Sequence, residues 1–476
     1  MKKIFVFIIV LSSVISNAQN KTSSSSRLVV LTHVNVIDAT GAPLQPDMTM
    51  IISGNRITAL DKTGKVHIPE NAIIINARGK YLIPGLWDMH MHVFNNVSKT
   101  PPDTNDFSMY IANGVTGIRE MWTKMESMPE VDRWRKQVYE LPGTIPRIGA
   151  VGTMIDGSPS QWLNSDTATT EEEARQRVQQ IKAAGIDFVK VYNRLQRKVY
   201  FAIADECKKQ KIPLGGHIPN RIVLKEAADA GQRSIEHLTG SRIIFDNDCS
   251  NFIAEVKKEL PDSIAAGSSI VPVMQQVLEL CDKDKAFAIF KYLAQKNVWQ
   301  CPTMVLYKRY ATDTTLVFGD PRLKYISGPE KILWKEQTGK SFRNGDSAYI
   351  YNVFAQVALM KKAGIKFLAG TDVDNHYLYP GFSLHDELAL FVRAGFSPME
   401  ALQAATINPA TFLGTIDSLG TIKKGKIADM VLLDANPLTD IRSTQRIHAV
   451  FLNGKYLSKE ELKAMLNNVA AMANKK

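Results

Sequence analysis

The chain has 476 residues, more than the roughly 100–200 residues of an ordinary domain, which predicts a large domain with a smaller one. Hydrophobic residues make up 45% and charged residues 22% of the sequence, a globular balance that excludes a disordered or fibrous chain. The formal net charge is +11. Because the basic residues are spread along the chain, with no basic run or basic–aromatic stripe, the charge does not favour nucleic-acid binding.

The chain begins with the pattern of a secretory signal. Lys2 and Lys3 precede the apolar run 4–11, and small and polar residues follow it. The run is shorter than the roughly 20 residues that a membrane-spanning helix needs, and no nearby cysteine offers a lipid anchor. We expect a signal peptide over 1–18, a flexible leader over 19–27, and export to the periplasm or beyond.

The cysteines do not indicate a shared site. They are Cys207, Cys249, Cys281 and Cys301. No C-x-x-C spacing occurs, and so few cysteines in a long chain do not form a disulfide framework. We expect buried free thiols, and the sequence leaves any pairing open.

The two ends of the chain differ from its middle. Segments 28–83 and 420–476 contain short alternating runs broken by turns, which predicts strands that pair into a small β-sandwich with a C-terminal helix. Segment 84–419 alternates strand-like and helical runs, including a helix capped by Thr170 and another that opens at Ser397. The predicted fold class is therefore α/β: a (β/α)8 TIM barrel with a sandwich built from both chain ends.

One stretch of the barrel is long for its number of strand–helix units. Segment 241–296 has a mostly helical sequence, and 297–303 is typical of the seventh strand. We expect 241–296 to be a helical insertion over the barrel mouth, where loops decide the substrate.

The histidines are the most informative residues. His90 and His92 are two residues apart in an apolar run, so on a strand both imidazoles point to the same face, where they can hold one metal ion. His217 and His237 each end a short strand-like run, and Asp372 ends another. Taken singly, each of these is as compatible with a structural role.

Lys190 stands in the apolar strand-like run 187–192, on the same face as Phe188 and Tyr192. A bare ammonium there would be costly. Two interpretations remain open: the lysine pairs with a carboxylate, or its charge has been changed chemically.

The ordered set resembles the amidohydrolase superfamily, whose barrels carry H-x-H after the first strand and metal-binding residues on the fourth, fifth, sixth and eighth. The matching positions are His90, His92, Lys190, His217, His237 and Asp372. Segments 384–388, 404–409, 420–429 and 450–455 also look like the family's. Within the superfamily, the sequence is most similar to the imidazolonepropionase-like group that includes metal-dependent Xaa-Pro dipeptidases.

The resemblance implies a chemistry. Lys190 implies the binuclear type, in which the lysine is carboxylated by CO2 and bridges two divalent metal ions, with zinc expected and manganese or cobalt also compatible. His90, His92 and Asp372 would hold one ion, and His217 and His237 the other. A bridging hydroxide would attack the amide, with Asp372 as general base and then general acid.

The residues that would contact the substrate are less clear. Arg119 could clamp a substrate carboxylate or form an internal ion pair. Tyr192 could hydrogen-bond a substrate oxygen, and His385 and His376 could reach the pocket.

The sequence thus predicts an exported binuclear amidohydrolase that cleaves a small amide such as an Xaa-Pro dipeptide. A hydrolase of cyclic amides or lactones, or a deaminase of a nitrogen heterocycle, with one or two metals, remains open, as does a non-catalytic binding protein on the same fold. We expect a small-molecule or dipeptide substrate, no nucleic acid and no stable membrane anchor, and the sequence leaves a homo-oligomer open.

Overall fold

The computed structural model describes residues 28–94, 104–162, 165–240, 283–341 and 347–475. The predicted signal peptide and leader, Cys249, Cys281 and residues 241–282 of the predicted insertion lie outside the described residues. Cys207 and Cys301 are buried free thiols, as expected.

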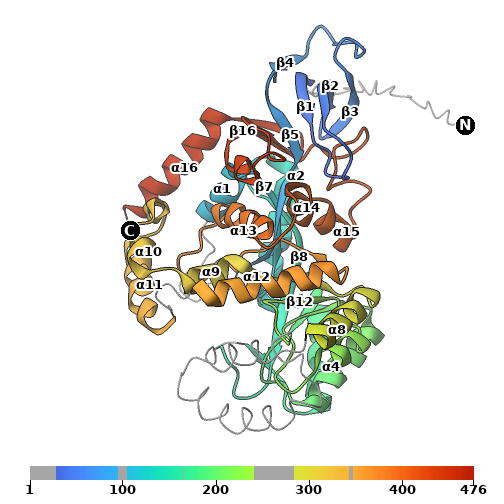
Figure 1. Cartoon of the computed structure of the whole chain (residues 1–476), viewed down its shortest axis with the longest axis vertical. Helices are drawn as coiled ribbons and strands as arrows, with labels where there is room; N and C mark the ends of the chain where they lie inside the picture. Colours follow the sequence, from blue (N-terminus) through green and yellow to red (C-terminus); the bar gives the residue numbers. More distant parts are fainter. Residues whose placement is uncertain (1–27, 95–103, 163–164, 241–282, 342–346, 476) are drawn as a thin grey trace, which may run out of the picture.

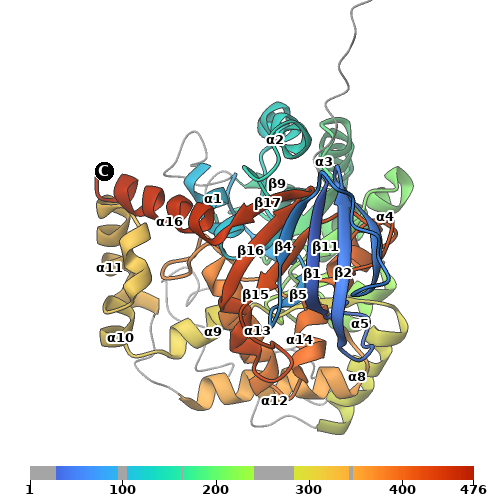
Figure 2. The ribbon, with the colours of Figure 1, turned by 90° about the horizontal axis from the view of Figure 1, so that it is seen from above.

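Strands from both chain ends share one mixed sheet at one end of the molecule (Figures 1 and 2). The order is β17-β16-β15-β5-β1-β2-β3, with β4 paired to β1, so β15 lies beside β5. Leu31, Met50 and Phe451, from both parts of the chain, belong to one buried core. The two-layer sandwich and the domain boundaries stay predictions. The strands are β1 Val29–Val36, β2 Gln45–Ser53, β3 Arg56–Lys62, β4 Ile73–Asn76, β5 Tyr81–Pro84, β15 Met430–Leu433, β16 Ile447–Leu452 and β17 Lys455–Ser458.

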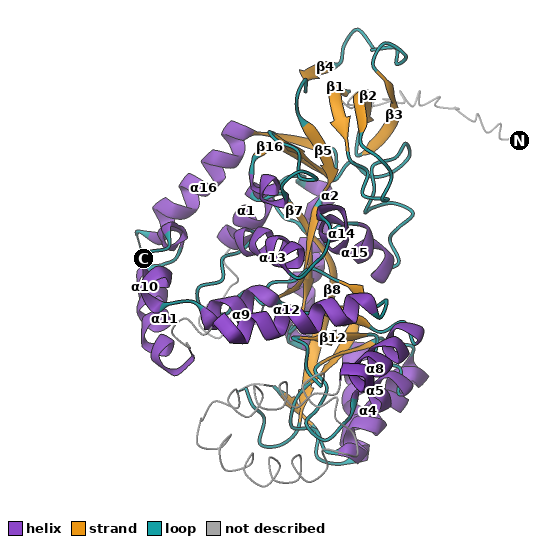
Figure 3. Ribbon diagram, viewed as in Figure 1, coloured by secondary structure: helices purple, strands orange, loops and turns teal. Residues whose placement is uncertain are grey.

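A second, parallel sheet runs through the middle of the molecule with helices outside it (Figure 3). Its order is β14-β13-β12-β11-β10-β8-β7-β6, and the short β9 pairs with β8. The residues after β14 bond to β6: Met89 N–H donates to Ala369 O at 2.9 Å, and Thr371 N–H to His90 O at 3.1 Å. The two edges of the sheet are thus joined, as in the predicted TIM barrel. The strands are β6 Leu86–Met91, β7 Val115–Glu120, β8 Arg147–Asp156, β9 Asp166–Thr167, β10 Phe188–Val191, β11 Leu214–Gly216, β12 Ser234–Glu236, β13 Trp299–Cys301 and β14 Lys366–Phe367.

The helices begin where the sequence places their caps. Thr170 caps α3 in a capping box with Glu173, and Ser397 caps α14 in the same way with Glu400. No described helix is long and apolar enough to cross a membrane. The helices are α1 Thr104–Ala112, α2 Met128–Glu140, α3 Glu171–Ala183, α4 Arg197–Gln210, α5 Leu224–Asp229, α8 Lys283–Gln295, α9 Met304–Ala311, α10 Thr314–Phe318, α11 Gly328–Ser341, α12 Ser347–Lys362, α13 Phe382–Arg393, α14 Pro398–Ala404, α15 Ile407–Phe412 and α16 Lys459–Ala473.

The structure corrects the prediction for 241–296 in its described part. Helix α8 packs against α5 and α12 and leads directly into β13. It is therefore an ordinary outer helix of the barrel, and its position is set by the buried side chains of Phe290 and Leu293, which belong to the barrel core. For α8 the prediction was wrong because an insertion helix and a barrel helix have the same apolar periodicity.

Candidate metal centre

Four imidazoles lie in contact at the carboxyl-terminal ends of β6, β11 and β12. The ring centroid of His90 is 5.4 Å from that of His92 and 4.3 Å from that of His237. The His237 centroid is in turn 4.9 Å from that of His217. The carboxyl-terminal ends of all the parallel strands lie at the same end of a barrel, which is why residues far apart in the sequence meet here.

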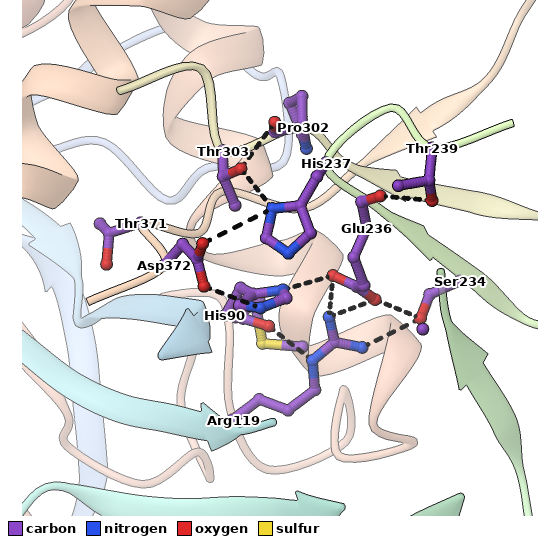
Figure 4. A network of polar contacts seen from close by, with 12 residues as sticks. His90, Arg119, Ser234, Glu236, His237, Thr239, Pro302, Thr303, Thr371 and Asp372 are labelled. Atoms are coloured by element: carbon purple, nitrogen blue, oxygen red, sulfur yellow. Dashed lines mark hydrogen bonds and ion pairs between the residues drawn. The ribbon is translucent and has the colours of Figure 1, made fainter. Parts of the chain in front are cut away.

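The carboxylate of Asp372 joins this group, as Figure 4 shows for His90 and His237. Its Oδ1 lies 3.2 Å from Nε2 of both His90 and His92, and its Oδ2 lies 3.9 Å from Nδ1 of His237. Two ligands that each stand ~2.1 Å from one tetrahedral zinc ion are about 3.4 Å apart. The spacing of His90, His92 and Asp372 therefore fits a shared metal ion.

Three of the imidazoles have one ring nitrogen fixed by a neighbour. The partners of Nδ1 are Glu236 Oε2 for His90, Asn193 Oδ1 for His217 and Thr303 Oγ1 for His237, each at 2.8 Å. An acceptor at Nδ1 places the ring proton there and leaves the Nε2 lone pair for a metal. Within the described residues, the buried Nε2 atoms of His90 and His217 have no hydrogen-bond partner. The donor set thus fits a divalent metal ion.

The charge states of His217, His237 and Asp372 also fit metal binding. Burial lowers the pKa of His237 to about 3 and that of His217 well below its usual value, so both imidazoles are neutral near pH 7. Burial alone would raise the pKa of Asp372, but His237 and His90 hold it well below its ordinary value. Neutral imidazoles and an ionised carboxylate are the forms that bind metal.

Lys190 lies on β10 with 2% of its surface exposed. Burial lowers the pKa of its amine, and its positive charge in turn lowers the pKa of His217 and His237. A lysine cation among these histidines would compete with metal binding. The structure thus brings all six predicted ligand positions to one place.

Tyr192 stands beside the cluster. Its ring centroid is 4.0 Å from that of His217, and its hydroxyl accepts a hydrogen bond from Trp162 Nε1 at 2.9 Å. The predicted position next to the ligands is therefore observed, and substrate contact by Tyr192 stays a prediction. Of the other histidines, His376 lies in the loop after Asp372, and its carbonyl accepts a hydrogen bond from Arg309.

The prediction that Arg119 clamps a substrate carboxylate is contradicted by its surroundings (Figure 4). The side chain is 1% exposed. Its Nη2 donates to both carboxylate oxygens of Glu236 at 3.0 Å, and its Nε donates to Met89 O at 2.6 Å. The buried ion pair, the alternative that the sequence left open, consumes this guanidinium.

His385 was also wrongly predicted to reach the pocket. It is 1% exposed on α13. One ring nitrogen lies 2.9 Å from Thr444 Oγ1 and the other 3.0 Å from Asn113 O. Both nitrogens therefore bind groups of the fold, and the residue joins α13 to the C-terminal part of the chain.

Glu236 is the main residue of the site that the sequence reasoning missed. It is fully buried and accepts hydrogen bonds from Arg119, from His90 and from Ser234 Oγ at 2.6 Å. Burial alone would raise its pKa, but Arg119 and then His90 hold it well below the ordinary value. The sequence shows that Glu236 shares a strand face with Ser234, but it does not say that this face is the barrel interior.

Three residues at the site have left-handed backbone conformations, which are rare for residues other than glycine. They are His237 with φ +56°, Thr303 with φ +48° and Asp372 with φ +63°. Such strain costs about 1–3 kcal/mol per residue and collects at functional sites. The backbone turns sharply here, so each side chain is directed into the barrel mouth.

Comparison with known proteins agrees with this geometry. A relative from Caldanaerobacter subterraneus subsp. tengcongensis, 5-methylthioadenosine/S-adenosylhomocysteine deaminase, is 23% identical over 435 residues, 83% of this chain and 85% of the relative. The Aspergillus niger ochratoxinase is 38% identical over 91 residues, so the match spans 19% of this chain and only 18% of that enzyme.

Among solved structures, a Xaa-Pro dipeptidase with bound methionine in its active site superposes with a TM-score of 0.63 at 17% identity, covering 91% of this chain and 100% of the other. At that identity, the likeness shows the fold. The model of the Amidohydrolase family matches residues 81–457. The chain therefore belongs to the amidohydrolase family and is a hydrolase that acts on carbon–nitrogen bonds.

Proposed function

We propose that the chain is an exported, two-metal hydrolase that cleaves the amide bond of a small substrate of the Xaa-Pro dipeptide class. The observation that carries the two-metal proposal is the place of Lys190, a buried amine beside histidines whose Nε2 atoms are oriented for metal. The likeness to a Xaa-Pro dipeptidase supports the substrate class.

The charge problem at Lys190 is resolved if the amine carries CO2. The neutral amine attacks the carbon of CO2, one N–C bond forms, one C=O bond becomes a C–O⁻ bond, and the nitrogen releases a proton. A cation is thereby replaced by an anionic carbamate with two oxygen ligands. Burial, which lowers the pKa of Lys190, favours the neutral amine that this reaction needs.

The ligand groups divide between two metal ions. His90, His92 and Asp372 would hold one ion, His217 and His237 the other, and carboxylated Lys190 would reach both. Zinc suits this set of imidazole and carboxylate ligands. Bound metal ions would polarise the scissile carbonyl and acidify water.

The protein's own groups then move the proton and orient the substrate. Asp372 takes a proton from the attacking water and passes it to the leaving nitrogen. Asn375 Nδ2 donates to Asp372 Oδ2 at 2.7 Å and fixes the orientation of the carboxylate. The Tyr192 hydroxyl donates to an oxygen of the substrate.

A second candidate function is hydrolytic deamination of a nitrogen heterocycle. It is favoured by the similarity to the deaminase, which extends over 435 residues. A single metal ion held by the same histidines would serve that reaction, with Lys190 as an ordinary buried lysine.

Metal content and activity of the Lys190→Ala variant test the proposal. We expect about two metal ions per wild-type chain and hydrolysis of an Xaa-Pro panel. Both should fall in Lys190→Ala, and a short carboxylic acid in the buffer should restore part of the activity by replacing the carbamate. Lys182→Ala, on the exposed face of α3, is the matched control. One metal ion in both proteins, with deamination of adenosine analogues and no dipeptide hydrolysis, would favour the second candidate.

The export proposal is tested separately. Mass spectrometry of the protein from a periplasmic fraction should give a chain that begins near residue 19. A full-length chain in the cytoplasm would contradict it.

A further inference from the structure

The loop that follows β8 is tied to the loop that follows β10. Asp156, at the end of β8, is fully buried, and its carboxylate accepts the backbone N–H groups of Gly157 and Gln161 at 2.9 Å and of Arg194 at 2.7 Å. Arg194 in turn donates through its guanidinium to the carbonyls of residues 159 and 160. These bonds hold residues 157–162 in a fixed position at the carboxyl end of the barrel.

This loop presents Trp162 next to Tyr192, whose ring contacts the candidate ligand His217. The indole is 48% exposed, yet its Nε1–H donates to the hydroxyl of Tyr192 at 2.9 Å. One edge of the ring is therefore anchored while about half of the residue stays open to water. Covering an exposed aromatic ring with an apolar group removes apolar surface from water and so stabilises the complex.

The same hydrogen bond sets the direction of the Tyr192 hydroxyl. A phenol has one proton to donate, and here its oxygen already accepts from Trp162. Among the described residues, the bond from Trp162 is the one hydrogen bond of this hydroxyl. Because the Tyr192 ring contacts His217, the proton of its hydroxyl is available to a substrate held at the candidate metal centre.

We propose that Trp162 is a specificity-determining residue, whose exposed indole face packs against an apolar side chain of the substrate while Tyr192 donates to a substrate oxygen. The proposal rests on the proposed function. It narrows the substrate class to small amides that carry an aromatic or large aliphatic group next to the scissile carbonyl. Pockets for small ligands commonly combine such an aromatic wall with a few placed polar groups.

The test compares kcat/KM for Phe-Pro and Gly-Pro. Trp162→Ala should reduce kcat/KM for Phe-Pro by about tenfold more than for Gly-Pro, the size expected when an apolar contact is lost. Trp162→Phe should keep the preference for Phe-Pro, because the ring remains, and should raise KM for both substrates, because Tyr192 loses its anchor. Phe201→Leu, which removes another partly exposed ring on α4, should change neither value. Equal losses on both substrates in Trp162→Ala, or no loss, would overturn the proposal.

A binding measurement separates this proposal from the proposed function. The difference in tryptophan fluorescence between wild type and Trp162→Phe is followed during titration with L-phenylalanine or glycine. A saturable change with L-phenylalanine that glycine does not produce would support the apolar wall, and the same response to both, or none, would overturn it. If wild type hydrolyses no dipeptide, the proposed function fails, and the fluorescence result still decides the role of Trp162.

Discussion

Glu236→Gln should destabilise the protein strongly, although glutamine has nearly the same shape. The substitution removes the negative charge that faces the guanidinium of Arg119, and both side chains are at most 1% exposed. Breaking a buried ion pair on one side leaves an uncompensated charge and costs about 3–5 kcal/mol. The same carboxylate accepts from His90 Nδ1, and loss of such a partner behind a metal ligand weakens metal binding by roughly 10–100-fold.

Urea unfolding of the metal-free protein measures the loss of stability, and competition with a chelator measures the loss of metal affinity. The matched control is Glu130→Gln, which breaks an exposed pair with Arg133 on α2 and should cost less than about 1 kcal/mol. Adding Arg119→Met to Glu236→Gln should restore part of the stability while metal affinity stays low. If the free energy of unfolding of Glu236→Gln lies within about 1 kcal/mol of the wild-type value and the variant retains its metal affinity, the assigned role of Glu236 is wrong.

Two further substitutions test how the site and the chain ends are held. In Gly370→Ala, a new Cβ would stand 2.8 Å from the His90 Cβ, so we expect a loss of about 1–3 kcal/mol in thermal unfolding together with weaker metal binding; an unchanged melting temperature would contradict this. In Asp434→Asn, the ion pairs with Lys80 and Lys459 are lost. Burial opposes ionisation of Asp434, but the two lysines lower its pKa. The ionised carboxylate therefore stabilises the folded chain by about 1 kcal/mol at neutral pH. This contribution disappears as the pH falls below the ordinary pKa of an aspartate and the carboxylate becomes protonated. The stability difference between this variant and wild type should therefore shrink in acid, and a constant difference would refute the assignment.

The six candidate ligand positions came from the resemblance to the amidohydrolase superfamily, and simple strand geometry explains why they lie together. His90 and His92 are two residues apart on a strand, so their common direction follows from strand geometry alone. His217, His237 and Asp372 each end a strand-like run, and the carboxyl ends of parallel strands converge in a barrel. The resemblance supplied the set as a whole, and the order of the strands along the chain supplied the expectation that its members meet.

The partners of those ligands could not be predicted in the same way. Arg119 lies on β7 and Glu236 on β12, and their contact forms only because the closed sheet brings both side chains into its interior. From the sequence, Arg119 has an adjacent acid in Glu120, and nothing selects the distant one. His385 failed for a related reason, since the angle at which α13 lies on the barrel decides which way its ring points, and sequence periodicity does not fix that angle.

Three residues of the candidate site have a positive φ, a conformation at which backbone preference alone would favour glycine. Glycine would relieve the strain at His237, Thr303 and Asp372, but it carries no ligand atom and no hydroxyl. The strain, about 1–3 kcal/mol per residue, is offset by bonds to the same segment: Thr303 binds the His237 ring, and Tyr307 donates to the His237 carbonyl. A metal ion at a free concentration of 100 times its Kd would add about 2.7 kcal/mol to the free energy of unfolding. This is comparable to the strain of one such residue. Eleven described residues other than glycine have a positive φ, and His237, Thr303 and Asp372 are the three of them at the candidate site. At these three positions the chemistry of the side chain, and not the conformational preference of the backbone, accounts for the choice of residue.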